Sequence, residues 1–240
     1  GDLANVTIDS TGATGAFATA VVGTSKSVTV TGVSLLGSAA GNYTVSQPTG
    51  VTADITQRAI TVTADAGQTK VYGAADPVFT SSVTSGSLVV GDSLSGLLTR
   101  AAGENVGTYA ISQGALTAGA NYNLTFVSDN LAITAKPITI TVDAGQTKVY
   151  GAADPTFTYA VSPALISGDS FSGALTRATG ESVGTYAITQ NGMTAGANYT
   201  ETFNGDNFAV TAKPLTISGV TASNKAYDNT TSATLNFGGA

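Results

Sequence analysis

The strongest constraint on this chain is an internal repeat. Residues 60–77 recur as residues 138–155, and only Ile140 and Val142 differ from their counterparts. Later blocks recur in the same order, with one residue fewer before them: Gly91-Asp92, Arg100, Gly107-Thr108-Tyr109 and Ala120-Asn121-Tyr122 return as Gly168-Asp169, Arg177, Gly184-Thr185-Tyr186 and Ala197-Asn198-Tyr199. Self-similarity of this kind predicts tandem copies of one small domain rather than a single large core.

A third copy is divided between the two ends of the chain. Residues 225–228 match residues 70–73, which lie at the front of a copy, and residues 41–43 match residues 120–122, which lie at the back. We therefore predict four segments: the back part of a domain at 1–57, complete domains at 58–136 and 137–213, and a front part at 214–240. Residues 1–57 are called the N-terminal piece below, and residues 214–240 the C-terminal piece.

Each copy has the pattern of short β-strands. Ile60, Val62 and Ala64 alternate with threonines, which is the period of a half-buried strand. Frequent glycine and Asp-Pro turns separate such runs, as in β-sandwiches. We predict an all-β chain of tandem small, Ig-like β-sandwich domains. The alternative is a β-grasp-like unit whose one short helix lies within residues 88–98.

The links between copies are short. Lys136-Pro137 and Lys213-Pro214 join the last strand of one copy to the first strand of the next without a Gly/Ser spacer. Proline fixes its own φ angle and holds the preceding residue extended. The sequence therefore predicts domains joined end to end in a rod.

The composition excludes several functions. The chain has no Cys and no His, charged residues make up 10%, and the net charge is −6. It therefore has no thiolate nucleophile, imidazole base or soft zinc site, and its charge opposes a nucleic-acid partner. No apolar run is long enough to span a membrane. We expect no enzyme, no catalytic residue, no cofactor and no membrane span.

The carboxylates are the remaining candidates for site chemistry, and they recur in both copies. Oxygen ligands of this kind suit Ca²⁺, but Asp-Pro and Gly-Asp are also turn dipeptides. We favour turn and loop roles and keep calcium as the alternative. The residues are Asp65, Asp76, Asp92 and Glu104, with Asp143, Asp154, Asp169 and Glu181 as their counterparts.

Other polar residues have structural interpretations that we prefer. Arg100 with Glu104, and Arg177 with Glu181, are expected to form local ion pairs across a hairpin turn. Lys70, Lys148 and Lys225 each precede a tyrosine by two positions. A Lys–Asn crosslink at these lysines is an alternative that we do not favour. The tyrosines Tyr72, Tyr109, Tyr122 and their counterparts are expected in the core rather than in a sugar-binding strip, with Tyr109 forming a tyrosine corner. Glu201 replaces Leu124 on an apolar face, without an explanation from the sequence.

The repeated motifs resemble a known family. Lys70-Val71-Tyr72-Gly73, Gly107-Thr108-Tyr109, Asn121-Tyr122 and Ala135-Lys136-Pro137 resemble the mostly-beta glycine-rich (MBG) repeats of the YGX type. Lys225-Ala226-Tyr227-Asp228 and the segment from Gly23-Thr24 to Gly41-Asn42-Tyr43 resemble the YDG domain, with Asn229 in place of the usual glycine. The resemblance implies large secreted bacterial surface proteins, including haemagglutinin-like adhesins, and no catalytic residues.

The divided copy suggests how the chain is used. Neither end piece has a whole core, and segments this small rarely fold alone. We predict that the C-terminal piece of one unit completes the N-terminal piece of the next, either along one longer polypeptide or by strand exchange between chains. The expected contact residues are Leu215, Ile217, Val220, Tyr227, Leu235 and Phe237 on one side, and Val6, Ile8, Phe17, Val28, Val30 and Tyr43 on the other.

We therefore predict a structural stalk or filament segment of a secreted bacterial surface adhesin, used for attachment or as biofilm matrix. Its expected partner is itself, head to tail, with a surface or glycan ligand possible as well. The alternative function is an extracellular module that binds carbohydrate or calcium.

Overall fold

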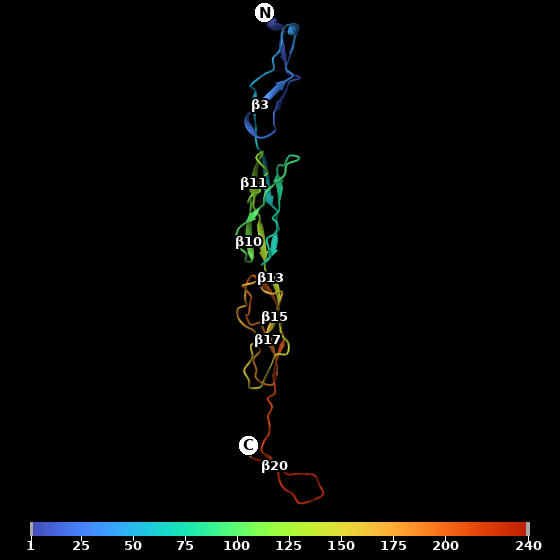
Figure 1. The fold of residues 1–240 in the computed structure, drawn as a ribbon, viewed down its shortest axis with the longest axis vertical. Coiled ribbons are helices and arrows are strands. Elements are labelled where there is room, and N and C mark those ends of the chain that lie inside the picture. Colours follow the sequence, from blue (N-terminus) through green and yellow to red (C-terminus); the bar gives the residue numbers. More distant parts are fainter. Residues whose placement is uncertain (1, 239–240) are drawn as a thin grey trace. The chain divides into compact units, whose positions relative to one another are not determined.

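The computed structural model describes residues 2–238, and this part of the chain is built of β-strands (Figure 1). Its only helices are short 3₁₀ turns at Asp2–Asn5 and Ala40–Asn42. The predicted all-β class is confirmed. Residues 88–98 form turns and an isolated bridge from Ser95 to Thr117, not the short helix of the β-grasp alternative. Within residues 2–238, no helix has the length and apolar character needed to cross a bilayer.

The first complete domain is a sandwich of two sheets. One sheet has the strand order β11-β6-β8 and the other β7-β12-β10-β9. The strands are β6 (Arg58–Ala64), β7 (Thr69–Val71), β8 (Ser81–Ser85), β9 (Thr99–Arg100), β10 (Gly107–Ser112), β11 (Tyr122–Val127) and β12 (Asn130–Thr134). Two pairs run parallel, β6 with β11 and β7 with β12, so the front and the back of the domain are hydrogen-bonded in both sheets.

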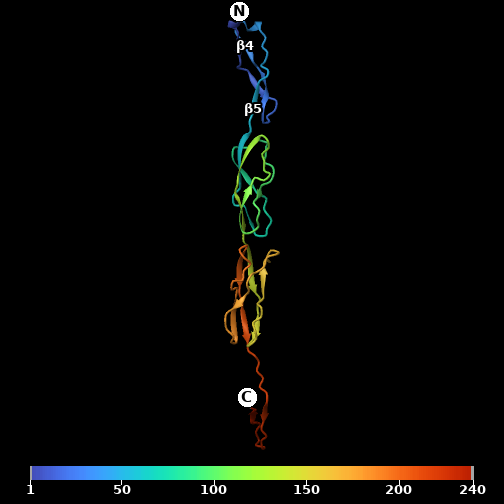
Figure 2. The same cartoon turned by 90° about the vertical axis from the view of Figure 1, so that its left-hand side faces the viewer.

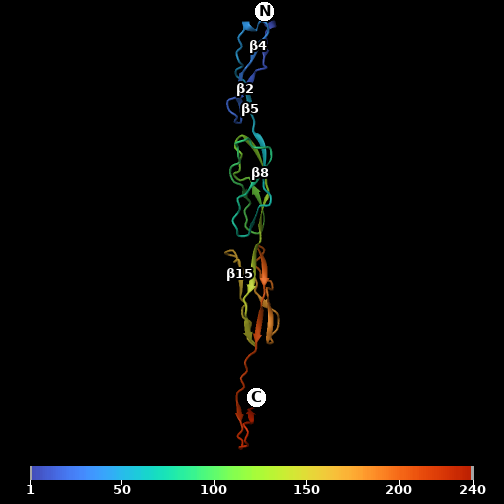
Figure 3. The ribbon, with the colours of Figure 1, turned by 90° about the vertical axis from the view of Figure 1, so that its right-hand side faces the viewer.

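The second complete domain repeats this topology strand for strand. Its sheets have the orders β15-β13-β18 and β14-β19-β17-β16. The strands are β13 (Lys136–Val142), β14 (Thr147–Val149), β15 (Tyr159–Ser162), β16 (Thr176–Arg177), β17 (Gly184–Thr189), β18 (Tyr199–Asn204) and β19 (Asn207–Thr211). Figure 3 labels β8 and β15, the corresponding edge strands of the two domains.

The alternating residues of the central strands form the two cores. Ile60, Val62 and Ala64 on β6 are at most 2% exposed, and they pack with Ile111 and Leu131 from the facing sheet. Each large aliphatic side chain buried in this way stabilises the fold by about 1.5–3 kcal/mol. The second core has the same construction around Ile140 and Phe208. The two-residue period of the sequence is thus the period of burial.

The two end pieces have strands but no buried core. The N-terminal piece contains β1 (Thr7–Asp9), β2 (Thr14–Phe17), β3 (Gly23–Thr31), β4 (Ser34–Leu36) and β5 (Thr52–Ile55), in the sheets β1-β4 and β2-β3-β5; Figure 2 labels β4 and β5. The C-terminal piece contains the pair β20 (Val220–Ala222) and β21 (Leu235–Phe237). No residue of 4–57 or of 211–238 is buried.

The chain divides into two compact units, residues 1–134 and 135–240. Each unit therefore holds one complete domain and one end piece. The division falls between β12 and β13, where the sequence predicted a domain link.

Candidate functional site

The most concentrated chemistry in each complete domain is a group of four charged side chains. In the first domain, Lys70 Nζ lies 2.7 Å from Asp76 Oδ1 and 2.5 Å from Glu104 Oε2. Arg100 joins the same two carboxylates, with Nε 2.7 Å from Asp76 Oδ2 and Nη2 2.5 Å from Glu104 Oε1. Two cations and two anions thus alternate in a closed ring. We call this ring the first charge cluster, and Lys148, Asp154, Arg177 and Glu181 the second.

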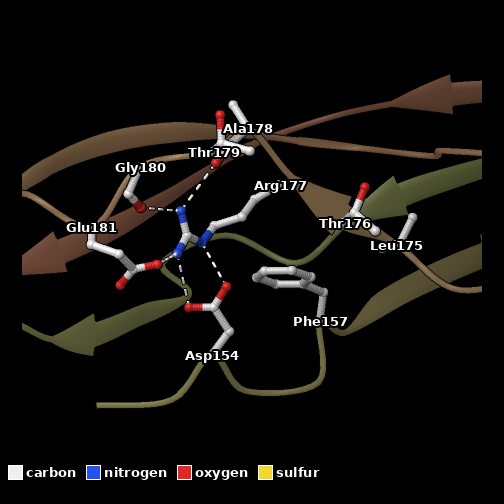
Figure 4. Close-up of a pocket in the computed structure, with 9 residues that line it drawn as sticks. All are labelled: Asp154, Phe157, Leu175, Thr176, Arg177, Ala178, Thr179, Gly180 and Glu181. Atoms are coloured by element: carbon white, nitrogen blue, oxygen red, sulfur yellow. Dashed lines mark hydrogen bonds and ion pairs between the residues drawn. The ribbon is translucent and has the colours of Figure 1, made fainter. Parts of the chain in front are cut away.

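The fold positions the cations on strands and the anions on loops. Figure 4 shows three members of the second charge cluster, with Arg177 extending from β16 toward Asp154 and Glu181. Arg177 Nη1 also donates to the carbonyl oxygens of Gly180 at 2.5 Å and Ala178 at 3.0 Å. The side chains of Lys148 and Arg177 are only 4% and 6% exposed, whereas those of Asp154 and Glu181 are 35% and 64% exposed. A cation buried to this extent requires paired acceptors, and the loop carboxylates and carbonyls provide them.

The clusters keep all their members ionised. Hydrogen bonds from Arg100, and next from Lys70, lower the pKa of Asp76 to about 2. Arg177 and Lys148 do the same for Asp154, whose pKa is also about 2. The pKa of Lys70 is raised, first by its hydrogen bond to Asp76 and then by that to Glu104. An acid–base catalyst needs a pKa near its working pH, so these groups suit a loop clamp and not proton transfer.

A tyrosine corner lies beside each charge cluster. The Tyr109 hydroxyl donates to the carbonyl oxygen of Asn105 at 2.7 Å, and the Tyr186 hydroxyl to that of Ser182 at 2.7 Å. The predicted corner is confirmed. The Arg177 guanidinium carbon lies 5.0 Å from the centre of the Tyr186 ring, within cation–π range.

One glycine of each cluster loop has to be glycine. Gly180 has φ +146°, and a Cβ at this position would overlap the ring of Tyr186. Gly103 has φ +138° and the same relation to Tyr109. A side chain there would meet both an unfavourable backbone region and the tyrosine ring. The glycine, the tyrosine and the arginine therefore form one packed unit in each domain.

Comparison with known protein families agrees with this duplicated construction. The family model of the MBG domain (YGX type) matches residues 60–132 and 138–209, which together make up more than half of the chain. The chain belongs to the MBG domain family. The model of the YDG domain matches residues 1–50. No curated protein matches the sequence. MBG and YDG domains are typical of extracellular, surface-associated repeat proteins, and these families are not known as enzymes.

The ion pairs of the MBG domains were predicted only in part. The pairs Arg100–Glu104 and Arg177–Glu181 are confirmed. The structure adds that the side chains of both arginines are less than a tenth exposed and that each arginine binds a second carboxylate. Sequence reasoning missed the lysine and aspartate members, although both recur in each copy.

The three lysines that precede a tyrosine by two positions differ in their surroundings. Lys70 and Lys148 are buried in the charge clusters, whereas the side chain of Lys225 is 38% exposed and lies 2.9 Å from Asp228. An amide crosslink requires an uncharged amine. The partners of Lys70 and Lys148 stabilise the charged ammonium instead, so the geometry favours ion pairs.

Of the other carboxylates that the sequence singled out, Asp65, Asp92 and Asp169 accept hydrogen bonds within the MBG domains. Asp65 accepts from the Ser82 hydroxyl at 2.7 Å, and Asp92 from the Tyr122 hydroxyl at 2.6 Å. Asp169 accepts from the Tyr199 hydroxyl at 2.5 Å. Among residues 2–238 there is no group of three or more carboxylate, His or Cys side chains that could hold a metal ion. These contacts agree with loop roles.

Five of the six tyrosines expected in the core lie in or against it. Tyr122 and Tyr199 are 6% and 7% exposed, and Tyr72, Tyr109 and Tyr186 pack against the cores. Tyr150, the counterpart of Tyr72, is 52% exposed, so the core prediction is wrong for that residue.

Glu201 has a clear role in the second MBG domain. Its carboxylate accepts from the Ala195 amide at 2.5 Å and the Thr194 hydroxyl at 2.8 Å, and it also pairs with the Gln190 amide group. Glu201 thus holds the loop before β18 through hydrogen bonds, at the position where the first MBG domain has the apolar Leu124.

The residues expected to form contacts between units are accessible. Leu215 and Tyr227 are each 90% exposed, Ile8 is 75%, and Ile217 is 70%. The other members are Val6, Phe17, Val28, Val30, Tyr43, Val220, Leu235 and Phe237, and none of them is buried. Large apolar side chains are thus uncovered in both end pieces. In contrast, Ile60 and Val62, the counterparts of Leu215 and Ile217, are buried in the core of the first MBG domain.

Proposed function

We propose that this chain is a structural segment of a secreted bacterial surface adhesin, in which copies join head to tail by completing the divided YDG-like domain. The observation that carries the proposal is the contrast in burial. The MBG domains have closed cores, whereas no residue of 4–57 or of 214–238 is buried. An exposed apolar face of this kind marks an interaction site.

The join has two possible forms with the same chemistry. Either the sequence is one period of a longer polypeptide, or separate chains exchange strands. Both give a heterologous contact that repeats in one direction and forms a stalk or filament. Attachment or matrix formation outside the cell is the role that this assembly would serve.

Electron microscopy and light scattering of the purified chain test this proposal. We expect the mass of the particles to rise with protein concentration and filaments to appear in the images. The matched control is the double variant Leu215→Asp/Ile217→Asp, which charges the C-terminal piece at two exposed positions and leaves both MBG cores intact. A monomer at every concentration, or equal assembly of the charged variant, would contradict the proposal.

A further inference from the structure

The MBG domains show which strands join the front and back of a copy. In the first domain β6 pairs in parallel with β11, with Arg58 opposite Tyr122 and Ile60 opposite Leu124. In the second, Lys136 lies opposite Tyr199 and Ile138 opposite Glu201. The register is therefore the same in both domains. A domain divided between its front and back parts loses this parallel pairing.

A second parallel pairing joins the other sheet. Lys70 on β7 lies opposite Ile133, and Lys148 on β14 lies opposite Val210. Three hydrogen bonds recur around this contact. In the first domain, Ala132 N donates to Gln68 O at 2.9 Å, Thr134 Oγ1 to Lys70 O at 3.2 Å, and Tyr72 N to Thr134 O at 2.8 Å. The second domain forms the same bonds at 3.0, 3.1 and 2.8 Å.

The N-terminal piece contains the back half of this arrangement. Its strands β3 and β5 pair with Gly23 opposite Ile55, as Gly107 lies opposite Ile133 and Gly184 opposite Val210. β5 therefore takes the place of β12 and β19. It lies at the edge of its sheet, without the parallel neighbour that β7 or β14 supplies in the MBG domains. Residues 43–47, which align with residues 122–126 of β11, form no strand.

The C-terminal piece contains the missing front half. Residues 213–217 align with residues 58–62 and 136–140, the starts of β6 and β13, but they form no strand here. Residues 224–226 align with β7 and β14 and also form no strand. Both segments are drawn in Figure 2 as coil. Each segment that forms no strand therefore corresponds to an MBG strand that takes part in a parallel pairing. In each case, the partner of that strand corresponds to a segment of the other piece.

We propose that the two pieces of successive copies join by parallel strand addition in the register of the MBG domains. Residues 213–217 of one copy align beside residues 43–47 of another, with Leu215 opposite Val45 and Ile217 opposite Gln47. Residues 224–226 add to the free edge of β5, with Lys225 opposite Ile55. This inference rests on the proposed function and specifies its contact.

The side chains agree with this register. Val45 is 39% exposed and Leu215 is 90% exposed, and pairing would bring these two apolar groups together on one face. Thr56 occupies the position of Thr134 and Thr211. In the joined domain its hydroxyl would donate to Lys225 O, and its carbonyl oxygen would accept from Tyr227 N. An open sheet edge and an unpaired extended segment are the two components that β-strand addition needs.

Cysteine crosslinking tests the register. Because the chain has no native cysteine, each introduced thiol is the only one in its copy. A copy carrying Leu215→Cys is mixed with a copy carrying Val45→Cys and treated with dibromobimane, a short crosslinker that fluoresces when it joins two thiols. Tyr43→Cys and Gln47→Cys report a register shifted by two residues. Thr44→Cys is the control, since its side chain points to the opposite face of the strand. We expect about tenfold more crosslinked dimer for Val45→Cys than for Thr44→Cys, because thiols on opposite faces cannot be bridged without movement of the backbone.

The other outcomes separate this inference from the proposed function. If the yield of crosslinked dimer is highest for Tyr43→Cys or Gln47→Cys, the proposed register is wrong, but completion of the domain between copies is still supported. Equal, low yields at all four positions, in samples where the unmodified chain still forms filaments, would place the contact elsewhere. Equal, low yields without any assembly would contradict domain completion itself.

Discussion

Lys70 and Lys148 are buried charged residues, each 8% exposed. Each is held by two carboxylates that come from loops far apart in the sequence. Spacing alone predicted the Arg–Glu pairs, because those residues are four positions apart. It did not predict the lysine contacts, because Lys70 and Glu104 are separated by 34 residues and meet only in the folded sheet. The recurrence of all four residues in both copies was the one available signal.

The charge clusters predict a loss of stability in acid. The pKa of Asp76 and of Asp154 is about 2 in the folded chain, below the ordinary value of 3.8. Because the folded pKa is lowered, the ionised groups stabilise the fold above the ordinary value, and this contribution is lost as the pH falls from 3.8 toward 2. Melting temperatures measured by circular dichroism across this range should fall steeply.

The variant Asp154→Asn provides the control for this pH dependence. It should lower the melting temperature of the second domain at neutral pH, because Lys148 and Arg177 lose an ionised partner. It should also weaken the acid dependence of that domain while leaving that of the first unchanged. An acid profile identical to that of the unmodified chain would show that the clusters do not set it.

At the scale of strands, alternation predicted where residues point but not which strands are neighbours. β6 and β13 were expected from Ile60-Thr61-Val62 and its counterpart, and their inward residues are buried. Their parallel pairing with β11 and β18 joins residues more than 60 positions apart. Period-two patterns are the same for parallel and antiparallel neighbours, so only the packed sheets reveal this pairing.

Phe208 on β19 should be the side chain whose removal costs the second domain most. It is fully buried and meets Phe157 edge to face, with ring centres 5.3 Å apart. Phe208→Ala should lower the free energy of unfolding of this domain by about 3–5 kcal/mol, through lost burial and the cavity left behind. Urea titration followed by circular dichroism measures this change. Leu215→Ala, at a 90% exposed position, is the matched control, and an equal effect there would refute the assignment of the core.

At the scale of the whole molecule, two closed domains and two open pieces share one chain. The MBG domains hold their loops with ion pairs and hydrogen bonds made by their own side chains. The exposed apolar residues of the end pieces, in contrast, are stabilised only when another segment covers them.

Calcium should therefore leave the melting temperature of the chain unchanged. Asp76, Glu104 and their counterparts are paired with lysine and arginine, and a metal ion would have to displace these cations. Thermal unfolding with calcium and with a chelator checks this, and a rise in melting temperature with calcium would contradict it. The intact mass should equal the 23.7 kDa of the sequence, without loss of water or ammonia.

The sequence by itself determined the all-β class, the two MBG copies and the Arg–Glu pairs, and the divided third copy stays a prediction from it. These features depend on local alternation, turn residues and self-similarity, which can be read along the chain. The tertiary structure alone decided the strand order, the parallel joins between the front and back of each domain, the burial of Lys70 and Lys148, and the role of Glu201. The physical reason is that these features depend on contacts between segments distant in sequence, and the hydrophobic pattern specifies which face is buried without specifying its neighbour.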